Sequence, residues 1–252
     1  MTLKAPFPGE SVISAIRIAR RDILATIAGI TTLGQTPVPN KTLARIIAVF
    51  GDSQAEGLAV ALRRVARQTP GIKVQNHTKA GSAISQPENY DWPAAIRAYE
   101  PDAQVDTAVL MFGGNDRLPM RPSPGVVIPF RSETWNQTYR SRAADMLHSL
   151  ADKHLRIFWV SNPICRDEKY SRDMEYLNAI YRDELAATDA TFIDIRAVVA
   201  DANGRYAPYG RTLDGTTARL RLDDGIHFTP SGYDLIATQV IKAILTPDEA
   251  AK

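Results

Sequence analysis

The sequence contains a single cysteine, Cys165, so it can form no intramolecular disulfide and no metal site built from several thiolates. It also has no excess of charge, because 30 Lys and Arg residues face 28 Asp and Glu residues, for a formal net charge of +2. A chain so close to neutral gives no electrostatic reason to expect nucleic acid as a partner. No run of about 18 apolar residues occurs, so we expect no transmembrane helix.

Several cofactor and catalytic signatures are missing as well. There is no Walker A loop, no GxGxxG, no HExxH and no cysteine-rich metal spacing, so neither a nucleotide cofactor nor a metal ion is implied. The GxSxG nucleophile elbow is absent too, which argues against the α/β-hydrolase fold. We therefore predict a chain that works without a cofactor.

From residue 44 onward, short apolar runs alternate with segments of helical periodicity. The apolar runs predict strands over 44–50, 72–76, 107–112, 156–160 and 191–195. Helices are predicted over 55–68, 132–153, 172–187 and 232–245. Five strands separated by helices predict an α/β fold, with a parallel sheet covered by helices on both faces. No linker or repeat interrupts the array, so we predict one domain over 44–252.

Residues 1–43 form a predicted N-terminal extension with two open interpretations. Arg20 and Arg21 precede a weakly apolar stretch over 23–33, which resembles a twin-arginine export signal. The alternative is an amphipathic helix, whose apolar face would comprise Val12, Ile13, Ile16 and Ala19. An export signal would place the protein in the periplasm or cell envelope, and its absence would leave it in the cytoplasm.

Two long segments interrupt the alternation of strands and helices. Residues 117–131 are rich in proline and follow the third strand, and residues 200–222 follow the fifth. Long irregular segments in a compact domain are usually functional or disordered. In open α/β sheets, the loops beyond the carboxyl ends of the strands surround the ligand site. Both segments are predicted to lie there.

Residues that could take part in catalysis follow the same strands. Gly51-Asp52-Ser53 comes after the first strand, Gly81 after the second and Asn115 after the third, and Asp224 and His227 precede the last helix. A serine at a helix N-terminus lies beside unpaired backbone N–H groups, which can stabilise an oxyanion.

The spacing of Asp224 and His227 suits a catalytic base and its orienting acid. A serine hydroxyl is a poor nucleophile unless a base takes its proton, and an imidazole serves when an acceptor holds its other nitrogen. Among the four histidines, only His227 has a carboxylate three residues before it. Each element alone has an ordinary alternative: Ser53 as a turn or cap residue, and the Asp-x-x-His pair as a surface hydrogen bond. Their combination and order favour the catalytic interpretation.

The four ordered blocks resemble the SGNH/GDSL hydrolase superfamily, which is centred on Ser, Gly, Asn and His. The resemblance runs from about Arg45 to Leu245. The stretches 203–206 and 221–232 are similar to a poorly characterised bacterial branch, often associated with the envelope. That branch is related to enzymes that add or remove acyl groups on polysaccharides.

The resemblance implies a flavodoxin-like, three-layer α/β/α sandwich with a five-stranded parallel sheet. It implies that Ser53 is the nucleophile, His227 the base and Asp224 the residue that orients the base. The backbone amides of Ser53 and Gly81, with the side chain of Asn115, would form the oxyanion hole. Asp223 competes with Asp224 as the orienting acid, but the spacing favours Asp224.

One departure from the family concerns Gln54, which stands where the GDSL signature has leucine. A polar side chain beside the nucleophile suits a polar substrate better than a lipid. Trp92, Trp135, Tyr206 and Tyr209 could stack on sugar rings, or simply pack in the core. Arginines gather in the two long segments and could recognise an anionic acyl group or acidic sugar, or be ordinary solvated residues. The candidate substrate contacts are Gln54, Trp92, Arg117, Tyr206, Tyr209 and Arg221.

The expected function is a serine esterase that removes short acyl groups, such as acetyl, from a carbohydrate or other polar alcohol. An O-acyltransferase that acts on a polysaccharide would use the same three residues, so the sequence leaves this alternative open. A glycan-binding module that kept the fold without the chemistry is a third interpretation. The expected partner is therefore a small-molecule or carbohydrate ester.

Overall fold

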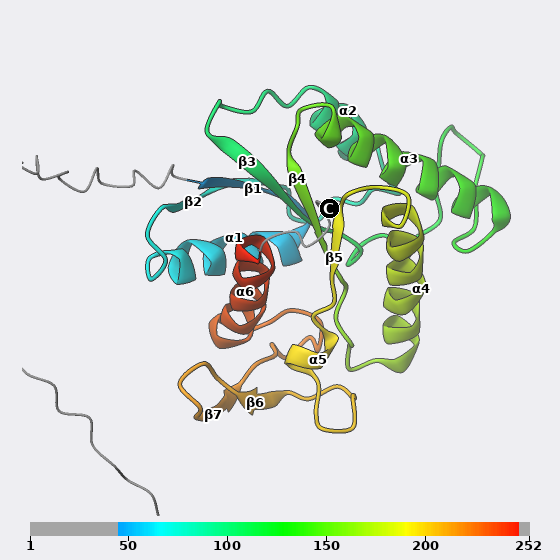
Figure 1. Cartoon of the computed structure of the whole chain (residues 1–252). Helices are drawn as coiled ribbons and strands as arrows, with labels where there is room; N and C mark the ends of the chain where they lie inside the picture. Colours follow the sequence, from blue (N-terminus) through cyan, green and yellow to red (C-terminus); the bar gives the residue numbers. More distant parts are fainter. Residues whose placement is uncertain (1–44, 247–252) are drawn as a thin grey trace, which may run out of the picture. The chain divides into compact units, whose positions relative to one another are not determined.

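The computed structural model describes residues 45–246, so the predicted extension over 1–43 lies outside the described residues. Five parallel strands form the central sheet, in the order β2-β1-β3-β4-β5 (Figure 1). The strands are β1 (Arg45–Gly51), β2 (Ile72–Thr78), β3 (Val105–Met111), β4 (Arg156–Val160) and β5 (Thr191–Ile193). This is the flavodoxin-like order, so the predicted α/β fold class is confirmed.

In the described part of the chain, six helices surround the sheet: α1 (Ser53–Ala66), α2 (Trp92–Arg97), α3 (Glu133–Ala151), α4 (Glu168–Leu185), α5 (Arg196–Val199) and α6 (Pro230–Leu245). Figure 1 shows α2, α3 and α4 on one face of the sheet and α1, α5 and α6 on the other. The buried side chains form two clusters that correspond to these two faces. The three layers of the predicted sandwich are therefore present.

The alternation of side chains along β1 explains why the strand is a continuous apolar run. Ile46, Ala48 and Phe50 pack into the cluster beneath α2, α3 and α4. Ile47 and Val49 pack into the cluster beneath α1 and α6. Successive residues of a strand point to opposite faces, so a strand covered on both faces must be apolar at every position.

Most elements lie within two residues of their predicted ends, but α4 begins at Glu168 instead of residue 172. The side chain of Asp167 caps this helix by accepting a hydrogen bond of 2.6 Å from the backbone N–H of Tyr170. The first turn of α4 is polar, so it carries no apolar periodicity. The helices α2 and α5 were not predicted, because six and four residues are too short to show a period.

The two long segments contain more order than the sequence indicates. In the segment 117–131, Met120 and Ile128 exchange two backbone hydrogen bonds of 2.9 Å. The segment 200–222 contains an antiparallel hairpin made of β6 (Tyr209–Arg211) and β7 (Thr217–Arg219).

None of the helices within residues 45–246 combines the length and the apolar character that crossing a membrane requires.

Candidate active site

The carboxyl ends of the first three strands meet at one edge of the sheet. Gly51, the last residue of β1, pairs with Thr78 of β2 and with Met111 of β3. The segments that carry Ser53 and Asn115 therefore leave the sheet side by side. Because parallel strands point the same way, residues distant in the sequence come together here.

The turn between β1 and α1 requires glycine at position 51. Gly51 has a φ of +144°, and a Cβ atom there would lie 2.0 Å from the carbonyl oxygen of Met111. Its neighbour Asp52 caps α1, with Oδ1 accepting a hydrogen bond of 2.9 Å from the backbone N–H of Gln54. Ser53 is consequently the first residue of the helix and is half-buried.

Ser53, His227 and Asp224 form a continuous chain of hydrogen bonds. The Oγ of Ser53 lies 2.8 Å from Nε2 of His227, and Nδ1 of His227 lies 2.6 Å from Oδ2 of Asp224. The serine and the histidine are separated by 174 residues in the sequence. The geometry is that of a nucleophile, a base and an acid that orients the base.

Asp224 organises the turn that carries the histidine. Its Oδ1 accepts hydrogen bonds from the backbone N–H groups of Ile226, at 2.8 Å, and of His227, at 2.9 Å. Partial burial opposes ionisation of Asp224, but these two bonds and the bond from the His227 ring outweigh it and lower the pKa of the carboxyl. The competing acid, Asp223, is exposed and forms an ion pair with Arg219. Asp224 therefore occupies the position that its spacing predicts.

Ser53, Gly81 and Asn115 were expected to form an oxyanion hole, and hydrogen bonds connect the loops that carry them. The side-chain amide of Asn115 donates a bond of 3.0 Å to the carbonyl oxygen of Ser82, next to Gly81. The backbone N–H of Gly114 donates a bond of 3.0 Å to Oδ2 of Asp52, next to Ser53. Since an amide group carries two hydrogens, Asn115 retains one donor beyond its bond to Ser82.

Asp52 is a fully buried carboxyl group beside the nucleophile. Burial raises its pKa to about 6, against the opposing effect of its bonds from Gln54 and Gly114 and of the nearby His227. Both carboxylate oxygens are used by backbone N–H groups. Asp52 therefore supports the loops on both sides of Ser53 instead of facing the solvent.

Asp116 is a second fully buried carboxyl group at this edge. Burial, together with the charge of Asp52, raises its pKa to about 7 against the opposing effect of its bonds from Ser85. Its Oδ1 accepts a hydrogen bond of 2.8 Å from the backbone N–H of Ser85. This bond joins the loop after β3 to the loop after β2.

Arg221 was expected to contact substrate, and the structure shows that this expectation is wrong. The residue is fully buried. Its guanidinium donates to the carbonyl oxygens of Ile164, at 2.8 Å, and of Ile226, at 2.9 Å, and stacks 4.1 Å from the ring of Phe228. Arg221 therefore holds the turn before His227 in place and cannot reach a ligand in solvent.

The expectation that Trp92 and Gln54 contact substrate is also wrong, because both are buried. Trp92 is 1% exposed, its Nε1 donates a bond of 2.9 Å to Oγ of Ser82, and its ring packs edge-on against Phe112. Gln54 is 2% exposed, so its side chain does not face the solvent beside the nucleophile. Trp135, the other tryptophan considered for stacking, is fully buried. An aromatic or polar side chain looks the same in sequence whether it binds ligand or fills the core.

The remaining candidate substrate contacts are Arg117, Tyr206 and Tyr209. Arg117 lies 3.5 Å from the carboxylate of Asp173, with its guanidinium 4.2 Å above the ring of Tyr170. Tyr206 is half-buried, and Tyr209 is 59% exposed at the start of β6. Both tyrosines therefore remain accessible, whereas the charge of Arg117 is already paired.

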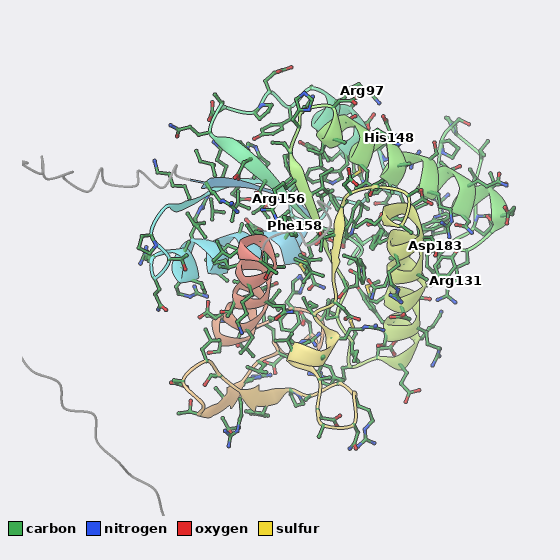
Figure 2. All side chains as sticks on the ribbon, in the orientation of Figure 1. Arg97, Arg131, His148, Arg156, Phe158 and Asp183 are labelled. Atoms are coloured by element: carbon green, nitrogen blue, oxygen red, sulfur yellow. The ribbon has the colours of Figure 1, made fainter. Side chains whose placement is uncertain are left out.

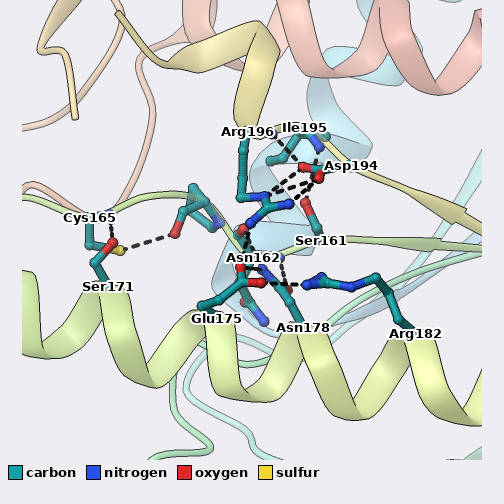
Figure 3. Close-up of polar contacts among 11 residues, drawn as sticks. Ser161, Asn162, Cys165, Ser171, Glu175, Asn178, Arg182, Asp194, Ile195 and Arg196 are labelled. Atoms are coloured by element: carbon teal, nitrogen blue, oxygen red, sulfur yellow. Dashed lines mark hydrogen bonds and ion pairs between the residues drawn. The ribbon is translucent and has the colours of Figure 1, made fainter. Parts of the chain in front are cut away.

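Two supporting residues have no signal in the sequence. The hydroxyl of Tyr170, on α4, donates to the carbonyl oxygen of Gly114. The side chain of Asn178, also on α4, accepts a bond of 2.7 Å from the backbone N–H of Asn162 and donates one of 3.1 Å to its carbonyl oxygen (Figure 3). Both lie in a mostly polar helix, where nothing distinguishes them from residues that face the solvent.

Solved structures share this fold at low sequence identity. A GDSL-like lipase from Bacteroides thetaiotaomicron is 16% identical, with a TM-score of 0.55 over 82% of this chain and 90% of its own. A variant of an acetyl-xylooligosaccharide esterase from Geobacillus Stearmophilus is 16% identical, with a TM-score of 0.54 over 83% and 97%. A carbohydrate esterase family 3 protein from Talaromyces cellulolyticus is 13% identical, with a TM-score of 0.51 over 80% and 96%.

These similarities confirm the resemblance to the GDSL hydrolases at the level of the fold. No curated protein sequence matches the chain. A family model does match, over residues 46–243, which include both long segments and all four blocks. The chain belongs to the family described as "Protein of unknown function (DUF459)".

Proposed function

We propose that the protein is a serine esterase that removes short acyl groups, such as acetyl, from a carbohydrate or another polar alcohol. The observation that carries the proposal is the distance of 2.8 Å between Oγ of Ser53 and Nε2 of His227. That distance lies within direct proton-transfer range, and the bond of 2.6 Å to Asp224 holds the ring in the required tautomer.

In the first half of the reaction, Oγ of Ser53 attacks the ester carbonyl carbon while Nε2 of His227 takes the hydroxyl proton. The negative charge moves to the carbonyl oxygen, where the backbone amides of Ser53 and Gly81 and the amide of Asn115 would stabilise it. Collapse of this intermediate breaks the bond to the alkoxy oxygen, and His227 returns its proton to the departing alcohol.

In the second half, His227 takes a proton from water as the water oxygen attacks the acyl-enzyme. Collapse releases the carboxylic acid and restores the Ser53 hydroxyl with the proton held by His227. Acyl transfer would differ only here, with a sugar hydroxyl in place of water. The ratio of free acid to acylated sugar, measured with an added glycan, therefore separates an esterase from a transferase.

A carbohydrate ester is supported by two features. Two of the solved structures that share the fold are named as an acetyl-xylooligosaccharide esterase and a carbohydrate esterase. In addition, Ser53 and His227 are half-buried, and Tyr206 and Tyr209 remain accessible and offer aromatic faces to a sugar.

The test is hydrolysis of 4-nitrophenyl acetate by the wild type and by Ser53→Ala, with Ser141→Ala as the matched control. Ser141 is an exposed serine of α3, so its loss should leave the rate unchanged. We expect a burst of nitrophenol from the wild type and no burst from Ser53→Ala. A fluorophosphonate probe should label Ser53 alone, whereas a non-catalytic binding module would not react. Equal rates for the wild type and Ser53→Ala would disprove the proposal.

A further inference from the structure

A cavity of about 790 Å³ adjoins the turn that carries Asp224 and His227. Its walls are the segment 163–166 after β4, one side of α4, and residues between 196 and 206 that follow β5. Both strands end at the edge of the sheet where Ser53 lies, so the cavity opens on the same end of the domain. Its volume is that of a site for a small molecule or a few sugar units.

The cavity is lined by more arginines than carboxylates. The arginines are Arg166, Arg172, Arg196 and Arg205, and the acids are Glu168, Glu175 and Asp201. The charges of three arginines are paired: Arg172 with Glu168 at 3.6 Å, Arg196 with Glu175 at 2.6 Å, and Arg205 with Asp201 at 3.5 Å. Figure 3 shows Glu175 reaching from α4 between Arg196 and Arg182.

Arg166 is the fourth arginine of the cavity wall, and its contacts differ from those of the other three. Its guanidinium donates a bond of 2.8 Å to the carbonyl oxygen of Asp223 and a longer one of 3.5 Å to the hydroxyl of Tyr206. Both acceptors are uncharged, and the Asp223 carboxylate pairs with Arg219. Within residues 45–246, Arg166 has no carboxylate at ion-pair distance. Its side chain is exposed, so its remaining N–H groups can bind an anion.

Arg166 is also joined to the turn of the catalytic acid. Its backbone N–H donates a bond of 3.1 Å to the carbonyl oxygen of Gly225, and its guanidinium binds that of Asp223. Asp224 lies between these two residues. A ligand held by Arg166 is therefore placed beside the residues that would cleave an ester.

We propose that this cavity binds an anionic group, a carboxylate or a phosphate, on the same glycan that carries the ester, so that the substrate is an acidic polysaccharide. The inference rests on the esterase function proposed above. Arg166 supplies the unpaired positive charge, and Tyr206 forms the adjoining wall.

The kinetic test compares acetylated substrates that differ in charge: an acetylated oligogalacturonide, an acetylated oligosaccharide bearing phosphate, and an acetylated neutral xylooligosaccharide. We expect the wild type to prefer an acidic substrate, and Arg166→Gln to lower the acidic-to-neutral ratio of kcat/KM about tenfold, through KM. The control is Arg97→Gln, which removes the same charge from α2. This helix lies at the opposite end of the domain from α5, whose first residue, Arg196, lines the cavity (Figures 1 and 2). Its ratio should equal that of the wild type.

A binding measurement separates this inference from the esterase function. Calorimetry with Ser53→Ala and unacetylated oligogalacturonide or phosphorylated oligosaccharide should detect binding that weakens with salt and is lost in Ser53→Ala/Arg166→Gln. The ligand that binds identifies the anion as carboxylate or phosphate. Binding without Ser53-dependent hydrolysis would refute the esterase and leave the anion site standing. Hydrolysis with equal kcat/KM for acidic and neutral substrates, in the wild type and Arg166→Gln, would overturn the anion site.

Discussion

Oδ2 of Asp52 accepts a hydrogen bond of 3.0 Å from the backbone N–H of Gly114. The other oxygen of the same carboxylate caps α1 through the N–H of Gln54. One buried side chain thus joins the helix that begins with Ser53 to the loop that carries Asn115. The relative position of nucleophile and oxyanion donor depends on it.

Asp52→Asn should lower kcat while leaving the helix cap intact. Asparagine caps helices as well as aspartate does, so its oxygen can still accept from Gln54. Its NH₂ group would then face the N–H of Gly114, which leaves that buried donor without an acceptor at a cost of roughly 1–3 kcal/mol. The matched control is Asp91→Asn at the cap of α2, where one oxygen accepts from Ala94. Initial rates on 4-nitrophenyl acetate should fall for Asp52→Asn only, and equal rates for both variants would contradict the positioning role.

Asp116 makes stability depend on pH in a defined direction. Its pKa of about 7 lies above the ordinary value of 3.8, so the folded state holds a proton that the unfolded chain releases. This stabilising contribution is complete below pH about 4 and is lost as the pH rises through about 7. Urea unfolding should therefore show wild-type stability falling relative to Asp116→Asn, by roughly 2–4 kcal/mol between pH about 4 and about 8.

A variant with the opposite pH dependence provides the control for Asp116. The hydrogen bonds and charge of Arg196 lower the pKa of Asp194, against a smaller opposing effect of burial. That contribution is present above the ordinary pKa and is lost as the pH falls. Asp194→Asn should consequently approach the wild type in acid and be less stable than it at neutral pH, whereas Asp116→Asn should gain stability relative to the wild type as the pH rises. Parallel curves for the two variants would refute the assignment.

Asp224→Asn should reduce kcat by about four orders of magnitude if Asp224 orients the base. The asparagine oxygen can still accept from the N–H groups of Ile226 and His227, so the turn should persist. Its NH₂ group would then meet Nδ1 of His227 and favour the tautomer that cannot accept the serine proton. Asp223→Asn, which breaks an exposed ion pair with Arg219, should change kcat less than twofold. A large loss of kcat in Asp223→Asn would show that Asp223, and not Asp224, orients the base.

Arg221→Lys should destabilise the protein as well as slow it. A lysine ammonium cannot reproduce the planar fork that reaches the carbonyl oxygens of Ile164 and Ile226. We expect a loss of roughly 2–4 kcal/mol in the free energy of unfolding, together with a lower kcat, because the turn before His227 loosens. A substrate contact would instead raise KM and leave the unfolding midpoint unchanged.

Much of the fold could be predicted because parallel strands covered on both faces must be apolar throughout. Most of β1, β3 and β4 consists of such runs, and the predicted ends lie within two residues of the observed ones. The short helices α2 and α5 carry no readable period, and the first turn of α4 depends on the cap provided by Asp167. Local pattern is therefore informative only where a segment is long enough to repeat it.

The sequence by itself determined the contact between Asp224 and His227, because a carboxylate three residues before a histidine reaches its ring within one turn. It also indicated that Ser53 begins a helix, since Gly51 and Asp52 act on their immediate neighbours. Only the tertiary structure decided that Trp92 and Arg221 are buried and that Arg166 has no carboxylate at ion-pair distance among the described residues 45–246. Burial and charge pairing are set by segments far away in the chain, whereas turns and caps are closed by atoms a few bonds apart.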